Sequence, residues 1–236
     1  MKLIEILNAL FPAGHEVGTF GQLIAGTAQT SSSTVAVLGT TDAAAIGHDI
    51  ALGLAGRILD IVDQHPGRPI VFLVDTKGQA LSRAEELLCL NGSLAHLARC
   101  VDLARRQGHV SVALVTGEAV SGGFLSFGLM ADKTYALADA QVRVMDLKAM
   151  ARVTKIAHER LVELAGSSPT FAPGAENYLS MGALEAIWDA PTAALLESAL
   201  DQRVAKGRLV DGRMDAGRER GGRSLAAQTV AAVLAA

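Results

Sequence analysis

Cysteine, aromatic residues and charge are all scarce in this chain of 236 residues. Aromatic side chains make up 4% of the sequence, and charged side chains 19%, against about 25% in an average domain. Hydrophobic residues make up 50%, which excludes an intrinsically disordered chain. Because soluble monomers rarely leave a large apolar surface bare, this low charge leads us to expect that a partner covers part of the surface.

The two cysteines cannot build a disulfide framework. Cys89 and Cys100 fall in one helical-looking segment, where they would lie about 16 Å apart along the helix axis. That separation excludes a disulfide between them, so we expect two buried free thiols and a cytoplasmic protein. Neither a Cys-x-x-Cys nor a His-x-x-x-His spacing occurs, and we predict no metal site.

The net charge of −3 excludes the basic surface that a nucleic-acid-binding protein needs. The most hydrophobic window, residues 111–131, is long enough to resemble a membrane span. Thr116-Gly-Glu118 and Ser121-Gly-Gly123 interrupt it, so we interpret it as a buried strand, a tight turn and a buried helix. Residues 1–10 lack the features of a signal peptide. We therefore expect no contact with a membrane.

Apolar runs with the pattern of strands alternate with segments that have helical periodicity. We expect strands at residues 35–38, 70–74, 110–115, 133–137 and 141–145, and helices at 49–64, 79–106, 122–130 and 150–164. Asn91-Gly92 is a candidate interruption of the long helix at 79–106. A loop is expected at 167–174, and a helical tendency from 192 onward. The alternation predicts an α/β fold with a mainly parallel sheet. We expect residues 1–236 to form a single domain, with a helical extension at about 200–236 that packs on a partner.

A glycine-rich segment, Gly117-Glu-Ala-Val-Ser-Gly-Gly123, joins the predicted strand at 110–115 to the helix that follows. The first amides of a helix have no partner within it, and the helix dipole adds partial positive charge there. Such a corner suits an anion, or an oxyanion that forms during a reaction. The alternative is that the glycines only allow close packing between strand and helix.

A second turn, Asp75-Thr-Lys-Gly-Gln79, is expected to lead the chain out of the preceding buried strand. In parallel α/β sheets, the loops at the carboxyl ends of the strands form the ligand crevice. The two turns are therefore expected to face one pocket.

These motifs carry a family resemblance. The paired motifs Val74-Asp-Thr-x-Gly78 and Gly117-Glu-x-x-Ser-Gly-Gly-x-x-x-x-Gly128 resemble the carboxyltransferase branch of the crotonase superfamily over about residues 35–190. The segment 181–189 is similar to a later turn of that superfamily. The resemblance implies a crotonase-like (Clp/crotonase) fold with ββα units and flanking helices. Within the branch, the chain most resembles the gamma subunit of biotin-independent malonate decarboxylase.

That resemblance implies an enzyme subunit, a carboxy-lyase that works as a heterodimer with a homologous beta subunit. The pair would convert a malonyl thioester, carried on the phosphopantetheine-type arm of an acyl carrier protein subunit, into the acetyl thioester and CO2. It implies no covalently bound cofactor, and an acyl-carrier transferase subunit as a further partner. It also implies an acyl-thioester site, in which the substrate-binding residues would be Thr76, Gly78, Gln79 and Ser121.

The chemistry of decarboxylation suits such a corner. Losing CO2 from a malonyl thioester leaves an enolate, so negative charge moves from the carboxylate to the thioester oxygen. Preset backbone amides stabilise such charge, each by about 3–4 kcal/mol. Our hypothesis is that the amides of Gly122 and Gly123 are the catalytic donors, in a composite site completed by the beta subunit.

Three alternatives stay open. A crotonase-type hydratase or isomerase needs two carboxylates, but Phe124 stands where one is expected, and Asp146 near the second position is equally an N-cap. A Clp-type peptidase would use Ser121, yet the first histidine after it is His158. A non-catalytic interface subunit is the third. The other histidines lie at no spacing from another residue that indicates a catalytic or metal site, and we assign them no chemical role: His15, His48, His65, His96 and His109.

Overall fold

The computed structural model describes residues 1–166, 172–201, 211–223 and 225–236, so most of the loop expected at 167–174 lies outside the described residues. The strands are β1 (His15–Phe20), β2 (Leu23–Gln29), β3 (Thr34–Thr40), β4 (Ala44–Ile46), β5 (Ile70–Gln79), β6 (Ser111–Val120), β7 (Lys133–Leu137), β8 (Gln141–Arg143) and β9 (Ala186–Trp188). The helices are α1 (Leu3–Leu10), α2 (His48–Gln64), α3 (Arg83–Leu87), α4 (Leu90–Arg106), α5 (Ser121–Phe127), α6 (Leu147–Thr154), α7 (His158–Ala165), α8 (Ala175–Ser180), α9 (Ala193–Leu200), α10 (Arg213–Glu219) and α11 (Ala226–Leu234).

One sheet organises the molecule, in the order β1-β2-β3-β5-β6-β7-β9. β1, β2 and β3 pair antiparallel, and all pairs from β3 to β9 are parallel. The first halves of β5 and β6 are wholly buried, as expected of parallel strands that are covered on both faces. The predicted α/β fold with a mainly parallel sheet is confirmed.

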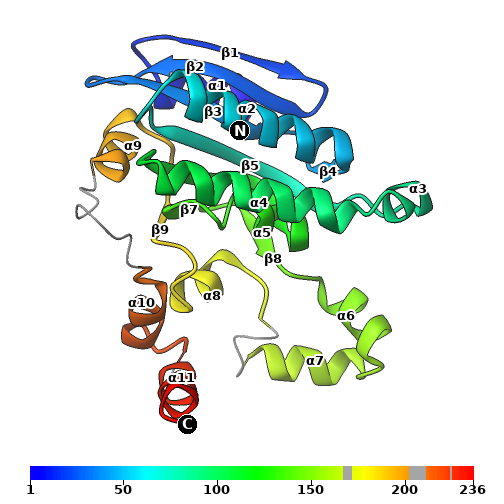
Figure 1. Cartoon of the computed structure of the whole chain (residues 1–236). Coiled ribbons are helices and arrows are strands. Elements are labelled where there is room, and N and C mark those ends of the chain that lie inside the picture. Colours follow the sequence, from blue (N-terminus) through cyan, green and yellow to red (C-terminus); the bar gives the residue numbers. More distant parts are fainter. Residues whose placement is uncertain (167–171, 202–210, 224) are drawn as a thin grey trace.

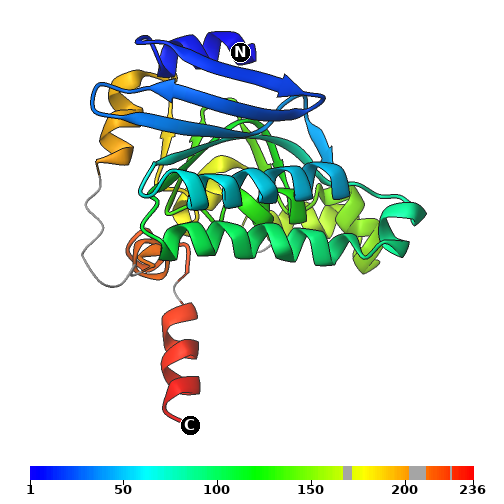
Figure 2. The same cartoon turned by 45° about the horizontal axis from the view of Figure 1, so that its top comes forward.

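Helices cover both faces of the sheet, so the molecule has two apolar cores. α2 and α4 lie side by side over one face, with α5 and α8 completing that core. α1 and α9 close the other face, as Figure 2 shows. There Trp188 stacks against Tyr135, with ring centroids 4.7 Å apart. On the first face Phe72 meets Phe127 edge to face at 5.8 Å.

The amino-terminal elements α1, β1, β2 and β4 were not predicted from the sequence. β1 is an edge strand whose residues are exposed or half-buried throughout, so it carries no apolar run that marks a strand. Gly26 lies within β2, where a side chain would collide with the main chain of Glu16 in β1. A glycine in a strand weakens the pattern while it permits this close approach.

The expected turns at Asp75–Gly78 and Thr116–Glu118 are wrong, because both segments continue as strand. β5 and β6 each run on for several residues, and their second halves leave the main path to pair with β4 and β8. A shift in register takes up the extra residues: Val74 pairs with Val115, but Thr76 pairs with Ala119. The glycine and acidic residues therefore mark a bulge.

The long helix expected at 79–106 is two helices, and the break falls at Leu88–Cys89 instead of Asn91–Gly92. Cys89 adopts a left-handed conformation with φ of 59°, which separates α3 from α4. The helix expected at 150–164 is likewise divided into α6 and α7, where Lys155 has φ of 62°. Residues other than glycine rarely adopt this conformation, so the sequence pattern did not reveal the breaks at Cys89 and Lys155.

Both cysteines are free, but only Cys100 is buried, and the prediction that Cys89 is buried was wrong. Cys89 occupies the N-cap position of α4 and is exposed. Burial raises the pKa of the Cys100 thiol.

The described carboxyl-terminal residues are helical. α10 lies against α8, where Arg220 donates hydrogen bonds to the carbonyl oxygens of Leu179 and Leu184. α11 projects away from the body (Figure 2), with Leu225, Val233 and Leu234 exposed. Its packing on a partner stays a prediction, and residues 202–210 lie outside the described residues. None of the described helices is long and apolar enough to span a membrane.

Replacing Phe72, which is fully buried, by alanine is expected to lower the free energy of unfolding by about 3–5 kcal/mol through lost burial and a cavity. The matched control is Phe20→Ala. Phe20 is 61% exposed and lies under the Arg57 guanidinium, so the cost should be about 1 kcal/mol or less. Urea unfolding of both variants measures the difference, and equal costs would contradict the two-core arrangement.

In the folded, isolated chain, iodoacetamide should alkylate Cys89 and spare Cys100. The raised pKa of Cys100 leaves less reactive thiolate at a given pH, and its burial excludes the reagent. Mass spectrometry after timed labelling measures both sites, and labelling in urea is the control in which both react. Equal rates in the folded chain would show that the α3–α4 region is not packed as described.

Candidate functional site

The carboxylate of Asp75 organises the bulge between β5 and β6. Asp75 lies opposite the extra residues of β6, and its Oδ1 accepts a hydrogen bond from the Glu118 amide at 2.8 Å. Its Oδ2 accepts one from the amide of Ala43 at 3.0 Å, in the segment before β4. One side chain thus joins three segments that are far apart in the sequence.

Gly117 is required by the same contact. A Cβ at this position would collide with the Asp75 carboxylate. The Asp and the Gly of the two sequence motifs are therefore complementary parts of one packing arrangement. The observed contacts of both motif residues set backbone geometry.

Thr76 and Gly78 form the next layer of this arrangement. The Thr76 side chain is fully buried, its hydroxyl donates to the carbonyl oxygen of Ala44 at 2.7 Å, and it accepts from the Gly78 amide at 3.0 Å. Gly78 has φ of 102°, which favours glycine. The hydroxyl is thus occupied in tying β4 to β5. As a substrate contact Thr76 remains a prediction, and its observed contacts hold the main chain of Gly78.

Helix α5 starts directly at the end of β6. Ser121 makes the corner with φ of 48°, an uncommon value for a serine. Gly123 is buried, and a Cβ there would come within 2.8 Å of the Thr76 hydroxyl and 2.9 Å of Gly78. Gly122 is partly exposed, and a Cβ there would lie 3.3 Å from Gln79 Oε1. Close packing against the main chain therefore explains the glycine at 123, whereas a Cβ at Gly122 would need only a small shift of the Gln79 side chain.

The structure brings the predicted site residues together at one place, which we call the glycine corner: Gly78, Gln79, Ser121, Gly122 and Gly123, with Thr76 beneath. Gln79 Oε1 is buried and has no hydrogen-bond partner among the described residues. Amides in the first turn of α5 have no acceptor within the helix. The corner thus combines a donor edge with one unpaired acceptor, and its partly exposed residues reach the surface of this chain.

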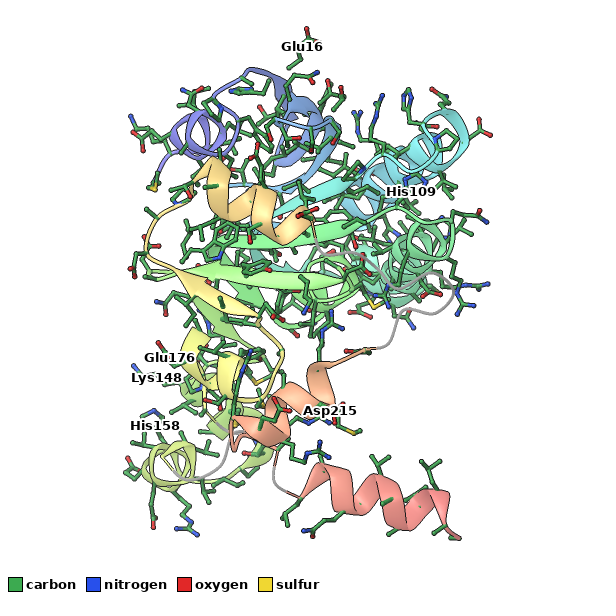
Figure 3. The ribbon with its side chains drawn as sticks, turned by 90° about the vertical axis from the view of Figure 1, so that its left-hand side faces the viewer. Glu16, His109, Lys148, His158, Glu176 and Asp215 are labelled. Atoms are coloured by element: carbon green, nitrogen blue, oxygen red, sulfur yellow. The ribbon has the colours of Figure 1, made fainter. Side chains whose placement is uncertain are left out.

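The ionisable residues weighed as catalytic groups near the corner mostly form ion pairs or cap helices. Glu118 pairs with Arg143 of β8. Asp146, weighed above as a second acid, accepts from the Ala149 amide at 2.7 Å and is the N-cap of α6. His158 begins α7 in a helical hairpin that extends away from the sheet (Figures 1 and 3). These contacts supply neither acid–base pair that the hydratase and peptidase alternatives need.

Two further features lie apart from the glycine corner. A hollow of about 1010 Å³ opens between the β7–β8 turn, α8 and β9, with Glu176, Asp189 and Arg220 in its wall, and the lining contains none of the predicted site residues. Burial raises the pKa of Tyr178, and a hydrogen bond from the Ser31 amide lowers the pKa of Glu197. Among the described residues, no group of three or more His, Cys, Asp or Glu side chains is placed to hold a metal ion.

A polar cluster near the corner was not predicted from the sequence. His48 Nδ1 lies 2.8 Å from Ser93 Oγ, and His48 Nε2 lies 3.1 Å from the carbonyl oxygen of Glu85. The partners are 45 and 37 positions apart in the sequence, so no spacing signal could have revealed them. From the sequence we assigned His48 no chemical role, and its hydrogen-bond partners become visible only in the fold.

Comparison with known families decides what this fold and corner belong to. Residues 41–236 match the family described as malonate decarboxylase gamma subunit. The chain belongs to that family. The match includes the glycine corner and the Asp75 bulge, and it confirms the resemblance drawn from the motifs.

Relatives of this family member agree in fold and extend the comparison. This chain is 37% identical over 121 residues to the Malonomonas rubra malonyl-S-ACP:biotin-protein carboxyltransferase MADD. The alignment covers 50% of this chain and 41% of that relative. The chain therefore spans less than half the length of the curated relative that it matches. A Pseudomonas malonate decarboxylase hetero-tetramer in complex with coenzyme A matches with a TM-score of 0.80 and 24% identity, over 95% of this chain and 96% of the other.

A Pseudomonas MdcD-MdcE hetero-dimer matches with a TM-score of 0.74 and 25% identity, over 94% of this chain and 97% of the other. Transcarboxylase 12S matches with a TM-score of 0.69 and 18% identity, over 86% of this chain and 42% of the other. These structures confirm the crotonase-like carboxyltransferase fold.

Asp75→Asn is expected to lower the free energy of unfolding by about 2–4 kcal/mol. The asparagine oxygen is a weaker acceptor than a carboxylate oxygen, and the asparagine NH2 group would face one of the two main-chain N–H donors. The control Asp63→Asn, an exposed residue in the last turn of α2, should change it by less than about 0.5 kcal/mol. Chemical denaturation measures both. An Asp75→Asn variant as stable as the control would show that the bulge does not depend on this carboxylate.

Proposed function

We propose that this gamma-subunit family member, in a heterodimer with a homologous beta subunit, converts malonyl-S-[acyl carrier protein] into acetyl-S-[acyl carrier protein] and CO2. It would act as part of a biotin-independent carboxy-lyase in the cytoplasm. The observation that carries the proposal is the family match across residues 41–236, which contains the glycine corner at the carboxyl end of β6.

The proposed chemistry is electrostatic. Breaking the bond to the carboxylate carbon puts an electron pair on the enolate, and its charge gathers on the thioester oxygen. The Gly122 amide, partly exposed in the first turn of α5, is the donor that we assign to that oxygen. Gly123 stays in the proposed donor set, although its buried position gives it a packing role as well. Gln79 and Ser121 would contact the acyl thioester from β5 and the corner itself.

The proposed partners are suggested by the assemblies in which similar proteins occur. The Pseudomonas structures are described as a hetero-dimer and a hetero-tetramer. Exposed apolar side chains on α3, α6 and α7, among them Leu87, Val153 and Val162, provide surface for a beta subunit to cover. We further propose an acyl carrier protein subunit, whose phosphopantetheine-type arm brings the substrate, and an acyl-carrier transferase that loads it. No covalently bound cofactor is part of the proposal.

Carboxyl transfer is the second candidate function. The Malonomonas rubra relative is described as a malonyl-S-ACP:biotin-protein carboxyltransferase, in which the carboxyl group passes to biotin. The complex should be given malonyl-loaded carrier with and without a biotinylated carrier protein. CO2 release without biotin supports decarboxylation, and release that requires the biotin protein supports transfer. A beta subunit that releases CO2 equally well alone would make this chain a non-catalytic interface subunit.

Gly122→Pro removes the proposed donor N–H and is expected to lower the rate of CO2 release about 100- to 1000-fold in the assembled complex. The matched control is Gly122→Ala, which also adds a Cβ, at 3.3 Å from Gln79 Oε1, but keeps the N–H. It should retain most of the activity. Assembly is checked by size-exclusion chromatography, and CO2 release by trapping labelled carbonate.

An assembled Gly122→Pro complex with the activity of the alanine variant would remove the donor role. Gly123 does not suit this test, because any side chain there would press against Thr76 and Gly78.

A further inference from the structure

The histidine cluster beside the glycine corner is arranged as a chain of hydrogen bonds. The His48 ring lies between Ser93 Oγ, 2.8 Å from Nδ1, and the Glu85 carbonyl oxygen, 3.1 Å from Nε2. A carboxylate oxygen of Glu85 lies 3.5 Å from Nε2, and the same oxygen accepts from the His48 main-chain amide. The ring is only 15% exposed, so these contacts fix its orientation.

Each neighbour of the ring is an oxygen atom that can accept a hydrogen bond. A doubly protonated imidazolium therefore fits the site with both N–H groups paired, and the Glu85 carboxylate balances its charge. In that form Nδ1–H donates to Ser93 Oγ, and the Ser93 hydroxyl is left to donate its own proton elsewhere. The order of groups is that of a proton relay, with Ser93 at its end.

Helix α4, which carries Ser93 at the end of this relay, packs against α5 beside the corner. Leu94, adjacent to Ser93 in α4, comes within 3.6 Å of a Cβ built on Gly122. On the other side, Ile46 pairs with Gln79, and His48 begins α2 two positions later. Figure 1 shows the starts of α2 and α4 together at the end of the molecule marked by α3. Elements that carry the relay thus contact elements that carry the proposed donors.

We propose that Ser93 and His48 deliver the proton that the enolate carbon requires after CO2 leaves. This inference rests on the proposed function and adds the step that backbone amides cannot perform. The enolate carbon forms a bond to the Ser93 proton, and Ser93 Oγ takes the Nδ1 proton of the His48 imidazolium. His48 becomes neutral and regains a proton from water, so one proton is consumed for each CO2 released.

The test uses the reverse of the proton-delivery step. An acetyl thioester on the carrier has no carboxylate to lose, but the complex should exchange its methyl hydrogens with D2O, because the relay then removes a proton and returns a deuteron. Mass spectrometry of the acetyl group measures this exchange. CO2 release from the malonyl-loaded carrier is measured on the same preparation.

Ser93→Ala and His48→Gln should each lower the exchange about 100-fold or more, the scale of general acid–base catalysis. They should lower CO2 release much less, since water can protonate an enolate that has already formed. Ser93→Thr keeps the hydroxyl and should restore exchange. His96→Gln, an exposed histidine on the same helix, is the matched control and should exchange as the unsubstituted complex does.

Exchange within about twofold of the unsubstituted complex in both variants would overturn the relay. An equal loss of exchange and CO2 release in Ser93→Ala would also overturn it, because it marks a disturbed site. An unsubstituted complex that releases no CO2 from the malonyl carrier would instead contradict the proposed function, so the two failures are distinct.

Discussion

The Asp75 carboxylate is the contact on which the candidate site depends. It accepts the amides of Glu118 and Ala43, and so joins β6 and the segment before β4 to β5. Without a charged acceptor at this point, two main-chain N–H groups would lose their partners. The bulge in β6 forms around this carboxylate, and Gly117 is the residue that leaves it room.

The bulge has consequences further along both strands. It allows the second halves of β5 and β6 to turn from the main sheet and pair with β4 and β8. Thr76 then ties β4 to Gly78, and Gly123 packs against both, so α5 starts in a fixed position. The result places the partly exposed Gly122 and the Gln79 oxygen, which has no partner among the described residues, at one edge of the chain. We propose that a sister subunit completes a site there.

Apolar runs made much of the fold predictable. The strands at 70–74 and 110–115 stand out because parallel strands buried on both faces need nearly continuous hydrophobic sequence. The same logic failed for β1, which is exposed, and for the ends of β5 and β6, where Asp75 and Gly117 look like turn residues. Their role depends on a contact between two strands that are far apart in the sequence. A local sequence pattern therefore does not reveal it.

The site was only partly predictable, for a related reason. Gly122 and Gln79 were found because their motifs resemble a family, and the fold then placed them side by side. His48, Ser93 and Glu85 come from three separate helices and meet only after α2, α3 and α4 pack. Thr76 shows the reverse case, since a residue chosen as a substrate contact has its hydroxyl bound to the main chain.

The central claim is that the main-chain amide of Gly122 faces the oxygen of a bound acyl thioester. A structure of this chain with its beta subunit and an unreactive malonyl thioester analogue, in which CH2 replaces the sulfur, tests it directly. We expect the carbonyl oxygen about 2.7–3.1 Å from the Gly122 nitrogen. An analogue held wholly by the partner subunit, with the Gly122 amide bonded to a protein acceptor, would contradict it.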